Sequence, residues 1–236
     1  MKKQQPVPPA MQPFLDGKLL LIDKPAHWTS FDVIRKIRND TNINKVGHAG
    51  TLDPLATGLL IICTGNFTKN ITEYMGMEKE YTGSVTIGAT TATYDMEGRP
   101  ENIKDIAAIT EEQIHAATKQ FTGNIMQVPP VFSAIKIGGK RSYKLARKGK
   151  EVEIEPRPVT IKEFDIIEIE LPKIYFRVVC STGTYIRSLA NDFGEALGVG
   201  GYLSSLRRTR IGNFLVGDAL TPAEMEEEVR VMHVSG

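Results

Sequence analysis

The stretch Val46-Gly-His-Ala-Gly-Thr-Leu-Asp-Pro-Leu-Ala-Thr-Gly-Leu-Leu60 contains the strongest structural signal in the chain. Its glycines permit backbone conformations that other residues avoid, and Asp53 is pushed out of the helical region by the proline that follows it. The apolar run after Gly58 is long enough for a buried strand and too short for a helix. A carboxylate on a rigid turn beside a buried strand is a candidate reactive group. The alternative is an Asp that only caps a turn, which is the commoner use of this residue next to proline.

The composition is that of an ordinary globular protein. The 236 residues are 41% hydrophobic and 24% charged, enough for one large domain or two small ones. The net charge of +1 does not by itself indicate a nucleic-acid binder. Cys63 and Cys180 lie in apolar runs without a Cys-x-x-Cys spacing, which favours buried reduced thiols over a zinc site or a disulfide. Because the sequence has no membrane-length apolar run and no signal-peptide core, we expect no membrane association and a cytoplasmic location.

The pattern of apolar residues predicts the fold class. Long alternating segments with helices between them, rather than regular strand–helix pairs, predict an α+β fold with a mixed, largely antiparallel central sheet flanked by helices and loops. A capping box at Thr110 marks the start of one helix, and Thr29 or Ser30 caps another. The expected strands are residues 19–22, 59–63, 79–87, 159–169 and 174–180, and the expected helices are residues 31–37, 67–75, 110–121 and 186–197.

Charge is segregated along the chain although the total is close to zero. Residues 136–150 hold seven Lys or Arg and no acid, whereas the next twenty residues hold seven acids and two bases. The basic run combines a Gly-Gly turn, a short helix capped by Ser142, and Tyr143. Such a projection suits a role in gripping phosphates while presenting an aromatic ring to a base. A basic run is most often a solvated face, but this combination favours contact with RNA.

The motif Gly47-His-Ala-Gly-Thr-Leu-Asp-Pro-Leu-Ala-Thr-Gly58 closely resembles the catalytic-aspartate motif of the TruB family of tRNA pseudouridine synthases. Further segments resemble the family in the same order, and the resemblance spans residues 19–214. These segments are Asp23-Lys-Pro-Ala-His-Trp-Thr-Ser30, Tyr81-Thr-Gly-Ser-Val-Thr-Ile-Gly88, Gly183-Thr-Tyr-Ile-Arg187 and Leu206-Arg-Arg208. In the segment from Asp23 to Ser30, His27 stands where the family has glycine.

The resemblance implies three catalytic residues. Asp53 corresponds to the catalytic aspartate, and Arg187 to an arginine placed against it, which would keep the carboxylate ionised and aimed. Tyr81 corresponds to a tyrosine that stacks on the target base and has been proposed as a proton acceptor. Taken by themselves, Tyr81 is equally an ordinary strand aromatic and Arg187 a structural ion-pair partner.

The resemblance also implies a set of substrate-binding residues. His48 would help to displace the target from the T loop, although an imidazole on a glycine-rich loop is also compatible with an inert turn residue. Tyr185 would lie in the uridine pocket, Leu206 would form an apolar wall, and the two arginines after Leu206 would meet backbone phosphate. The remaining residues expected to contact RNA are Lys24, Lys136, Arg141, Tyr143, Arg147 and Arg207. Lys24 alone would also fit a solvated surface charge.

The implied domain organisation and chemistry complete the expectation. We expect a mobile N-terminal arm over residues 1–16, a catalytic domain over 17–216 with a basic insertion at about 124–150, and a short acidic tail over 217–236 without a PUA domain.

The reaction would be isomerisation of uridine to pseudouridine at position 55 of tRNA: the N1–C1′ bond breaks, the base rotates, and C5 is joined to the sugar. Neither cofactor nor metal is expected. Whether Asp53 attacks C1′, attacks C6 or removes a sugar proton stays open.

The implied partner is the T stem-loop of tRNA, bound by a monomer without a guide RNA. Two alternatives stay open. The first is an RNA-binding or RNA-folding module in which Asp53 is incidental. The second is a subunit of a guide-RNA-dependent synthase.

Overall fold

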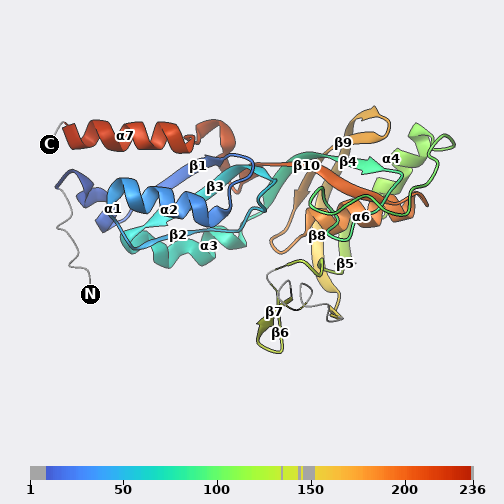
Figure 1. Ribbon diagram of the computed structural model, residues 1–236, viewed down its shortest axis with the longest axis horizontal. Coiled ribbons are helices and arrows are strands. Elements are labelled where there is room, and N and C mark those ends of the chain that lie inside the picture. Colours follow the sequence, from blue (N-terminus) through green and yellow to red (C-terminus); the bar gives the residue numbers. More distant parts are fainter. Residues whose placement is uncertain (1–8, 134, 143–144, 146–151, 235–236) are drawn as a thin grey trace. The chain divides into compact units, whose positions relative to one another are not determined.

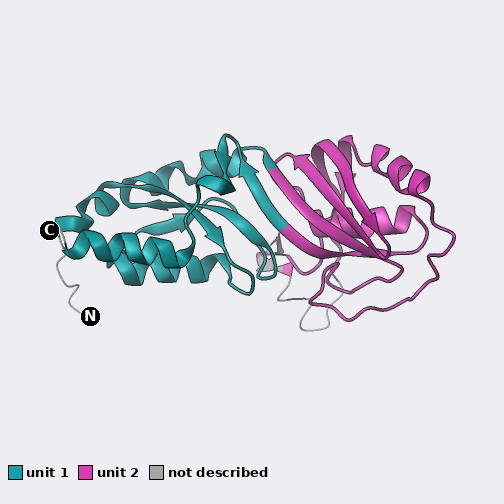
Figure 2. Cartoon of the chain, turned by 90° about the horizontal axis from the view of Figure 1, so that it is seen from above, with its two compact units in different colours: residues 1–79, 207–236 teal, residues 80–206 magenta. Residues whose placement is uncertain are grey.

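The chain forms two compact units in a computed structural model that describes residues 9–133, 135–142, 145 and 152–234 (Figure 2). Unit 1 comprises residues 1–79 and 207–236, and unit 2 comprises residues 80–206. Among the described residues, no helix combines the length and the apolar character needed to cross a bilayer.

The sheet of unit 1 is organised around β3 (Thr57–Thr64), which follows the Asp53 loop. β3 pairs antiparallel with β1 (Leu19–Lys24) and β2 (Val46–His48), and its first residues pair parallel with β10 (Gly201–Ile211). Leu60 and Ile62 pack into one hydrophobic cluster, whereas Leu59, Ile61 and Cys63 pack into another. Successive side chains of a strand point to opposite faces, so both faces of β3 are covered. The expected buried strand is confirmed, and burial raises the pKa of the Cys63 thiol to about 11.

Helices cover one of these clusters. α2 (Ser30–Thr41) begins with a capping box in which the Thr29 and Asp32 side chains each bond the other's backbone N–H. It buries Val33, Ile34 and Ile37 in the cluster that also contains Leu60 and Ile62. The remaining short elements of unit 1 are η2 (Gly65–Asn70), α3 (Ile71–Gly76), β11 (Phe214–Leu215) and η3 (Val216–Asp218).

Both ends of the chain contain helices where they are described, so residues 9–16 differ from the expected mobile arm. Residues 9–16 form η1 (Pro9–Met11) and α1 (Gln12–Asp16), because Met11 and Phe14 are buried in the core. Residues 1–8 lie outside the described part. The acidic C-terminal segment contains α7 (Pro222–Val234), which packs beside α2 (Figure 1). Its Met225 and Val229, one helical turn apart, are buried in the same cluster, and this burial stabilises the helix.

Unit 2 is a sheet with the strand order β10-β4-β9-β8-β5. Its longest strands, β8 (Arg157–Glu170) and β9 (Lys173–Cys180), pair antiparallel, and β8 also pairs antiparallel with β5 (Gly123–Gln127). β4 (Lys79–Ile87) begins at the border of the two units. The pairs β1–β3, β5–β8 and β8–β9 are antiparallel and β3–β10 is parallel, so the expected α+β fold with a mixed, largely antiparallel sheet is confirmed.

The described part of unit 2 also contains helices. α4 (Glu111–Lys119) starts at the expected Thr110 capping box. Phe193 of α6 (Ile186–Ala196) is buried. Its ring packs edge-to-face with that of Phe164 in β8, and the ring centroids are 5.4 Å apart.

The basic insertion contains a two-stranded hairpin, β6 (Lys136–Ile137) and β7 (Lys140–Arg141). Gly138 and Gly139 have φ of +55° and +80°, the conformation of a tight hairpin turn, so the Gly-Gly turn is confirmed. The backbone of Lys136 pairs with that of Arg141 in the register of the hairpin. The expected helix with Tyr143 and Arg147 lies outside the described residues.

Candidate active site

Asp53 lies on the loop between β2 and β3, and α2 fixes the residue before it. The backbone N–H of Leu52 donates to Ser30 Oγ over 2.9 Å, and the same hydroxyl donates to the Leu52 carbonyl over 3.2 Å. Within the loop, the Ala56 N–H donates to the Asp53 carbonyl over 3.1 Å. Because both backbone groups of Leu52 are engaged by one buried serine, the Asp53 loop is held against the first turn of α2.

Arg208 binds the carbonyls of this loop, a role that its sequence position does not reveal. Its side chain is 1% exposed, and its Nε donates to the Leu59 carbonyl over 2.7 Å. Its two Nη groups donate to the carbonyls of Gly50 and Thr51 over 3.1 and 3.4 Å. The expectation of phosphate contact is therefore wrong for Arg208, whose guanidinium is buried and used within the fold. A cation at a buried strand position needs hydrogen-bond acceptors, but the sequence alone does not indicate which groups these will be.

Lys24 holds the loop from the other side. The side chain is fully buried, and Nζ donates to the carbonyls of Trp28, Pro25 and Pro54 over 2.6, 2.9 and 3.4 Å. Burial lowers the pKa of Lys24 to about 8, and the negative charge of Asp53 opposes part of that shift. The simpler interpretation of Lys24 as a solvated surface charge is wrong. Because Pro54 directly follows Asp53, Lys24 ties the β1–α2 turn to the candidate catalytic loop.

His27 occupies the position at which the family motif has glycine. Its φ is +66°, in the left-handed region, and its N–H donates to the Pro54 carbonyl over 2.7 Å. Histidine adopts this conformation less readily than glycine. The turn that glycine would favour is therefore kept, and it also contacts the Asp53 loop.

His48 is the last residue of β2 and is half-buried. Burial lowers the pKa of His48, and the positive charge of Arg208 lowers it further. A hydrogen bond with the Gly50 backbone acts in the opposite direction and raises this pKa in part. The imidazole is thus neutral at pH 7, which suits packing against a base rather than pairing with a phosphate.

Arg187 is presented by the first turn of α6 in unit 2. Its side chain is buried, and its Nη groups donate to the carbonyls of Phe132 and Thr93 over 3.1 and 3.3 Å. Its Nε lies 3.7 Å from Oδ2 of Asp95, which is itself held by the Thr93 hydroxyl over 2.6 Å. The positive end of the α6 dipole opposes an arginine here, and the Asp95 carboxylate offsets this. Asp95 was not among the expected site residues.

Tyr185 is the N-cap residue of α6, and Gln127 fixes its backbone. The Gln127 amide accepts from the Tyr185 N–H over 2.8 Å and donates to the Tyr185 carbonyl over 3.1 Å. Gln127 is 2% exposed, and the sequence alone does not single it out. Tyr81 lies in β4 and is 8% exposed.

The expected site residues thus fall into the two units. Lys24, His48 and Asp53 gather around one loop in unit 1, and Arg207 lies nearby, paired with Asp23 through two hydrogen bonds of 2.7 and 3.0 Å. The others belong to unit 2: Tyr81, Tyr185, Arg187, Leu206, Lys136 and Arg141. The pair between Asp53 and Arg187 would join the two units and stays a prediction.

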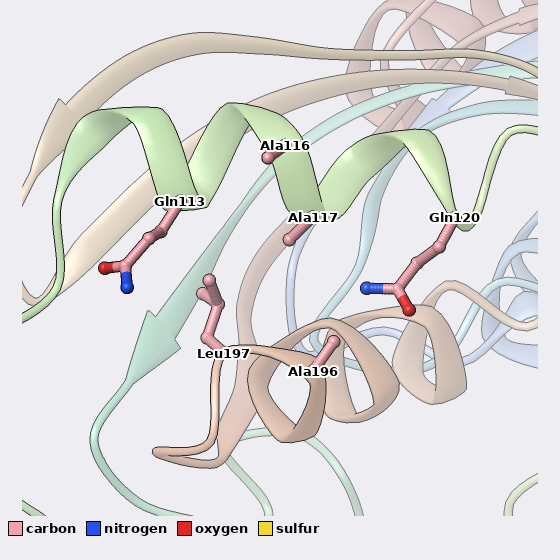
Figure 3. Close-up of a pocket in the computed structure, with 6 residues that line it drawn as sticks. All are labelled: Gln113, Ala116, Ala117, Gln120, Ala196 and Leu197. Atoms are coloured by element: carbon pink, nitrogen blue, oxygen red, sulfur yellow. The ribbon is translucent and has the colours of Figure 1, made fainter.

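A shallow pocket of about 320 Å³ lies between α4 and α6 (Figure 3). None of the expected site residues lines it, and its walls carry amides and small apolar groups rather than acids or bases. The lining residues are Gln113, Ala116, Ala117, Gln120, Ala196 and Leu197.

Comparison with known proteins identifies the class of protein. Residues 38–186 match the family model described as TruB family pseudouridylate synthase (N terminal domain), and residues 187–233 match the tRNA pseudouridylate synthase B C-terminal domain. The chain belongs to the TruB family of pseudouridine synthases.

The similar curated proteins carry the name tRNA pseudouridine synthase B. The protein of Flavobacterium johnsoniae is 52% identical over 224 residues, which cover 92% of this chain and 98% of the relative. That of Chloroherpeton thalassium is 49% identical, covering 91% of each chain. That of Corynebacterium diphtheriae is 47% identical, covering 92% of this chain and 74% of the relative.

Solved structures share the fold. A chain in a Cbf5–Nop10–Gar1 complex is 30% identical, with a TM-score of 0.73, and the match covers 93% of this chain and 56% of that one. A chain in an H/ACA RNP bound to a substrate RNA containing 2′-deoxyuridine is 26% identical, with a TM-score of 0.72, covering 97% and 58%. This chain therefore spans a little over half the length of those chains.

Proposed function

We propose that this chain is a tRNA pseudouridine synthase that isomerises the uridine at position 55, in the T loop. The proposal is supported by relatives named tRNA pseudouridine synthase B that match along almost their whole length. The observation that carries it is the construction of the Asp53 loop. Two buried cations, Lys24 and Arg208, donate to carbonyls on that loop, and the Asp53 side chain is only partly buried.

The reaction is an isomerisation, so it needs no other reactant, and it requires a carboxylate held in a fixed position. The N1–C1′ bond of uridine breaks and a C5–C1′ bond forms, while the proton lost from C5 is replaced by one gained at N1, so atoms and electrons balance. Asp53 acts on the sugar carbon, on base C6 or on a sugar proton. A preorganised charge in a partly desolvated loop stabilises the charge that develops when the bond breaks.

The other residues take the roles that the family motifs imply. Arg187 pairs with Asp53, and its guanidinium is already oriented by Asp95 and by two carbonyls. Tyr81 stacks on the base, Tyr185 and Leu206 border it, and His48 helps to displace it from the loop.

The remaining basic residues hold the RNA. Lys136, Arg141, Tyr143, Arg147 and Arg207 contact the T stem-loop. Lys24 acts through the loop that it holds. The chain works as a monomer in the cytoplasm without a guide RNA, and light scattering at the mass of one chain, 26.1 kDa, tests its oligomeric state.

The decisive experiment compares Asp53→Asn with the wild type on a T-arm transcript, with no other RNA present. We expect pseudouridine formation to fall at least about 10³-fold while binding of the transcript changes little. Asp105→Asn, at an exposed loop position, is the matched control and should react at the wild-type rate. A transcript with cytidine at position 55 controls for the site of modification.

The outcomes separate the alternatives. An undiminished rate in Asp53→Asn would overturn the proposed mechanism. A wild-type protein that binds the transcript without forming pseudouridine would support an RNA-binding or RNA-folding module. A requirement for an added guide RNA would support the guide-dependent alternative.

A further inference from the structure

An exposed aromatic ring lies between two arginines on the outer side of α2. Phe31 is 56% exposed. The guanidinium carbons of Arg35 and Arg38 lie 6.0 and 5.9 Å from the centre of its ring, at the limit of a cation–π contact. The spacing i, i+4, i+7 places the three side chains on one face of the helix. We call Phe31, Arg35 and Arg38 the α2 strip.

The α2 strip has no evident function in the core. α2 is anchored by Val33, Ile34 and Ile37, which are buried in the hydrophobic cluster that does not include Phe31. A large apolar ring facing water contributes little to folding, so its replacement should leave the fold intact. An exposed aromatic flanked by cations is instead a common arrangement for holding nucleic-acid bases and phosphates.

The charge of the strip is positive. Arg35 is 61% exposed and forms an ion pair with Asp32, which offsets one charge. Arg38 donates from one Nη to the Val46 carbonyl over 3.1 Å, while its buried Nε has no hydrogen-bond partner among the described residues. Lys45, the residue directly before Val46, is exposed and adds another positive charge. Positive charge beside an aromatic ring complements an anionic, base-bearing partner.

The strip borders the candidate catalytic loop within unit 1. Ser30, the residue before Phe31, bonds both backbone groups of Leu52, and Leu52 precedes Asp53. At the other end of the strip, Arg38 bonds the carbonyl of Val46, the first residue of the strand that ends at His48. The strip is therefore tied to both ends of the segment from Val46 to Asp53. An RNA whose uridine reaches Asp53 has neighbouring nucleotides within reach of this face.

We propose that the α2 strip is a second RNA-contact surface, on which an unpaired base of the bound tRNA stacks against Phe31 while Arg35 and Arg38 contact the adjacent phosphates. This inference rests on the proposed function. It adds a contact that depends on α2 rather than on the basic insertion. The strip contributes to binding and not to bond breaking.

The test measures binding of a T stem-loop RNA to Phe31→Leu, Phe31→Tyr and Arg35→Gln at several salt concentrations. Loss of one base–aromatic stack corresponds to about 5- to 150-fold weaker binding, so we expect this increase in Kd and KM for Phe31→Leu with kcat within about twofold. Phe31→Tyr keeps the stacking ring and should stay within about threefold of the wild type. Arg35→Gln should lower the slope of log K against log salt by about 0.7 to 0.9.

Matched controls come from the same unit. Arg230 in α7 is also exposed and paired with an acid three residues earlier, Glu227, so Arg230→Gln removes the same kind of ion pair away from the strip. Phe67 is 40% exposed in η2, and Phe67→Leu removes an aromatic outside the strip. Both controls should bind RNA as the wild type does.

If Phe31→Leu and Arg35→Gln both bind RNA with the wild-type affinity and the wild-type slope of log K against log salt, the inference is overturned. The strip would then be a candidate surface for a protein partner. Unfolding midpoints equal to that of the wild type exclude misfolding as the cause of weaker binding. Because Kd is measured by fluorescence anisotropy and not by pseudouridine formation, the binding result is independent of the Asp53→Asn experiment. Weaker binding by Phe31→Leu would support the strip even if no pseudouridine formed.

Discussion

Replacing Arg208 with methionine removes the guanidinium that holds the Asp53 loop, and the neighbouring Arg207 supplies a matched comparison. Three carbonyls, those of Gly50, Thr51 and Leu59, accept from Arg208. Leaving a buried carbonyl without a donor costs about 1–3 kcal/mol, and relief of the buried positive charge offsets part of the sum. We therefore expect Arg208→Met to lower the free energy of unfolding by about 3–5 kcal/mol.

Arg207→Met should cost much less. The Arg207 side chain is 41% exposed, and it pairs with Asp23 through two hydrogen bonds. An ion pair of this exposure contributes about 0–1 kcal/mol. The two substitutions change the same residue type at adjacent positions of β10, so the difference between them reports burial and bonding to the loop.

Urea unfolding followed by tryptophan fluorescence measures this difference directly. Trp28 is the single tryptophan of the sequence, and it belongs to unit 1, as do both arginines. Initial rates of pseudouridine formation give a second readout, and we expect a lower kcat for Arg208→Met because the Asp53 loop loses its orientation. Unfolding free energies of the two variants within about 1 kcal/mol of each other would refute the role given to Arg208.

Further predictions concern Lys24 and Gly58. Lys24→Met should lower the free energy of unfolding at pH 7 by about 1–3 kcal/mol, because the carbonyls bound by Nζ lose their donor. The folded-state pKa of Lys24, about 8, lies below the unfolded value of 10.5, so the unfolded chain holds more protons between these values. The wild type should therefore gain stability relative to Lys24→Met as the pH rises from 8 to 10.5, and a constant difference in urea unfolding would contradict this. Gly58→Ala should cost about 2–5 kcal/mol, because φ is +102° and the new Cβ would lie 2.3 Å from the Arg208 carbonyl oxygen. Gly76→Ala, where nothing lies within 4 Å, is its control and should change the unfolding midpoint little.

The expected site residues belong to different units. Asp53, His48 and Lys24 belong to unit 1, whereas Tyr81, Tyr185 and Arg187 belong to unit 2. Each half is held by its own buried contacts: Arg208 and Lys24 in the first, Asp95 and Gln127 in the second. Substitutions at these four supports should alter kcat through the orientation of another side chain, which distinguishes them from Asp53 itself.

The sequence by itself determined the local elements. A continuous apolar run identified β3, apolar alternation identified β4 and β8, and the apolar segment 174–180 identified β9. The capping box at Thr110 located the start of α4. The Gly138-Gly139 turn was also predictable. These features depend on residues a few positions apart, whose conformational preferences and spacing are visible in the sequence. The family motif likewise pointed to the family, because a long contiguous match is specific, and the catalytic role of Asp53 that it implies stays a prediction.

Only the tertiary structure decided which polar side chains support the site. Arg207 and Arg208 are adjacent arginines, yet one pairs with Asp23 at the surface and the other is buried against two loop carbonyls and one carbonyl of β3. The helical order of residues 9–16 and of α7 similarly depends on Met11, Phe14, Met225 and Val229 entering a shared core. Burial and hydrogen bonding between segments distant in the sequence determine these outcomes, and neither composition nor periodicity encodes which partner a buried charge will find.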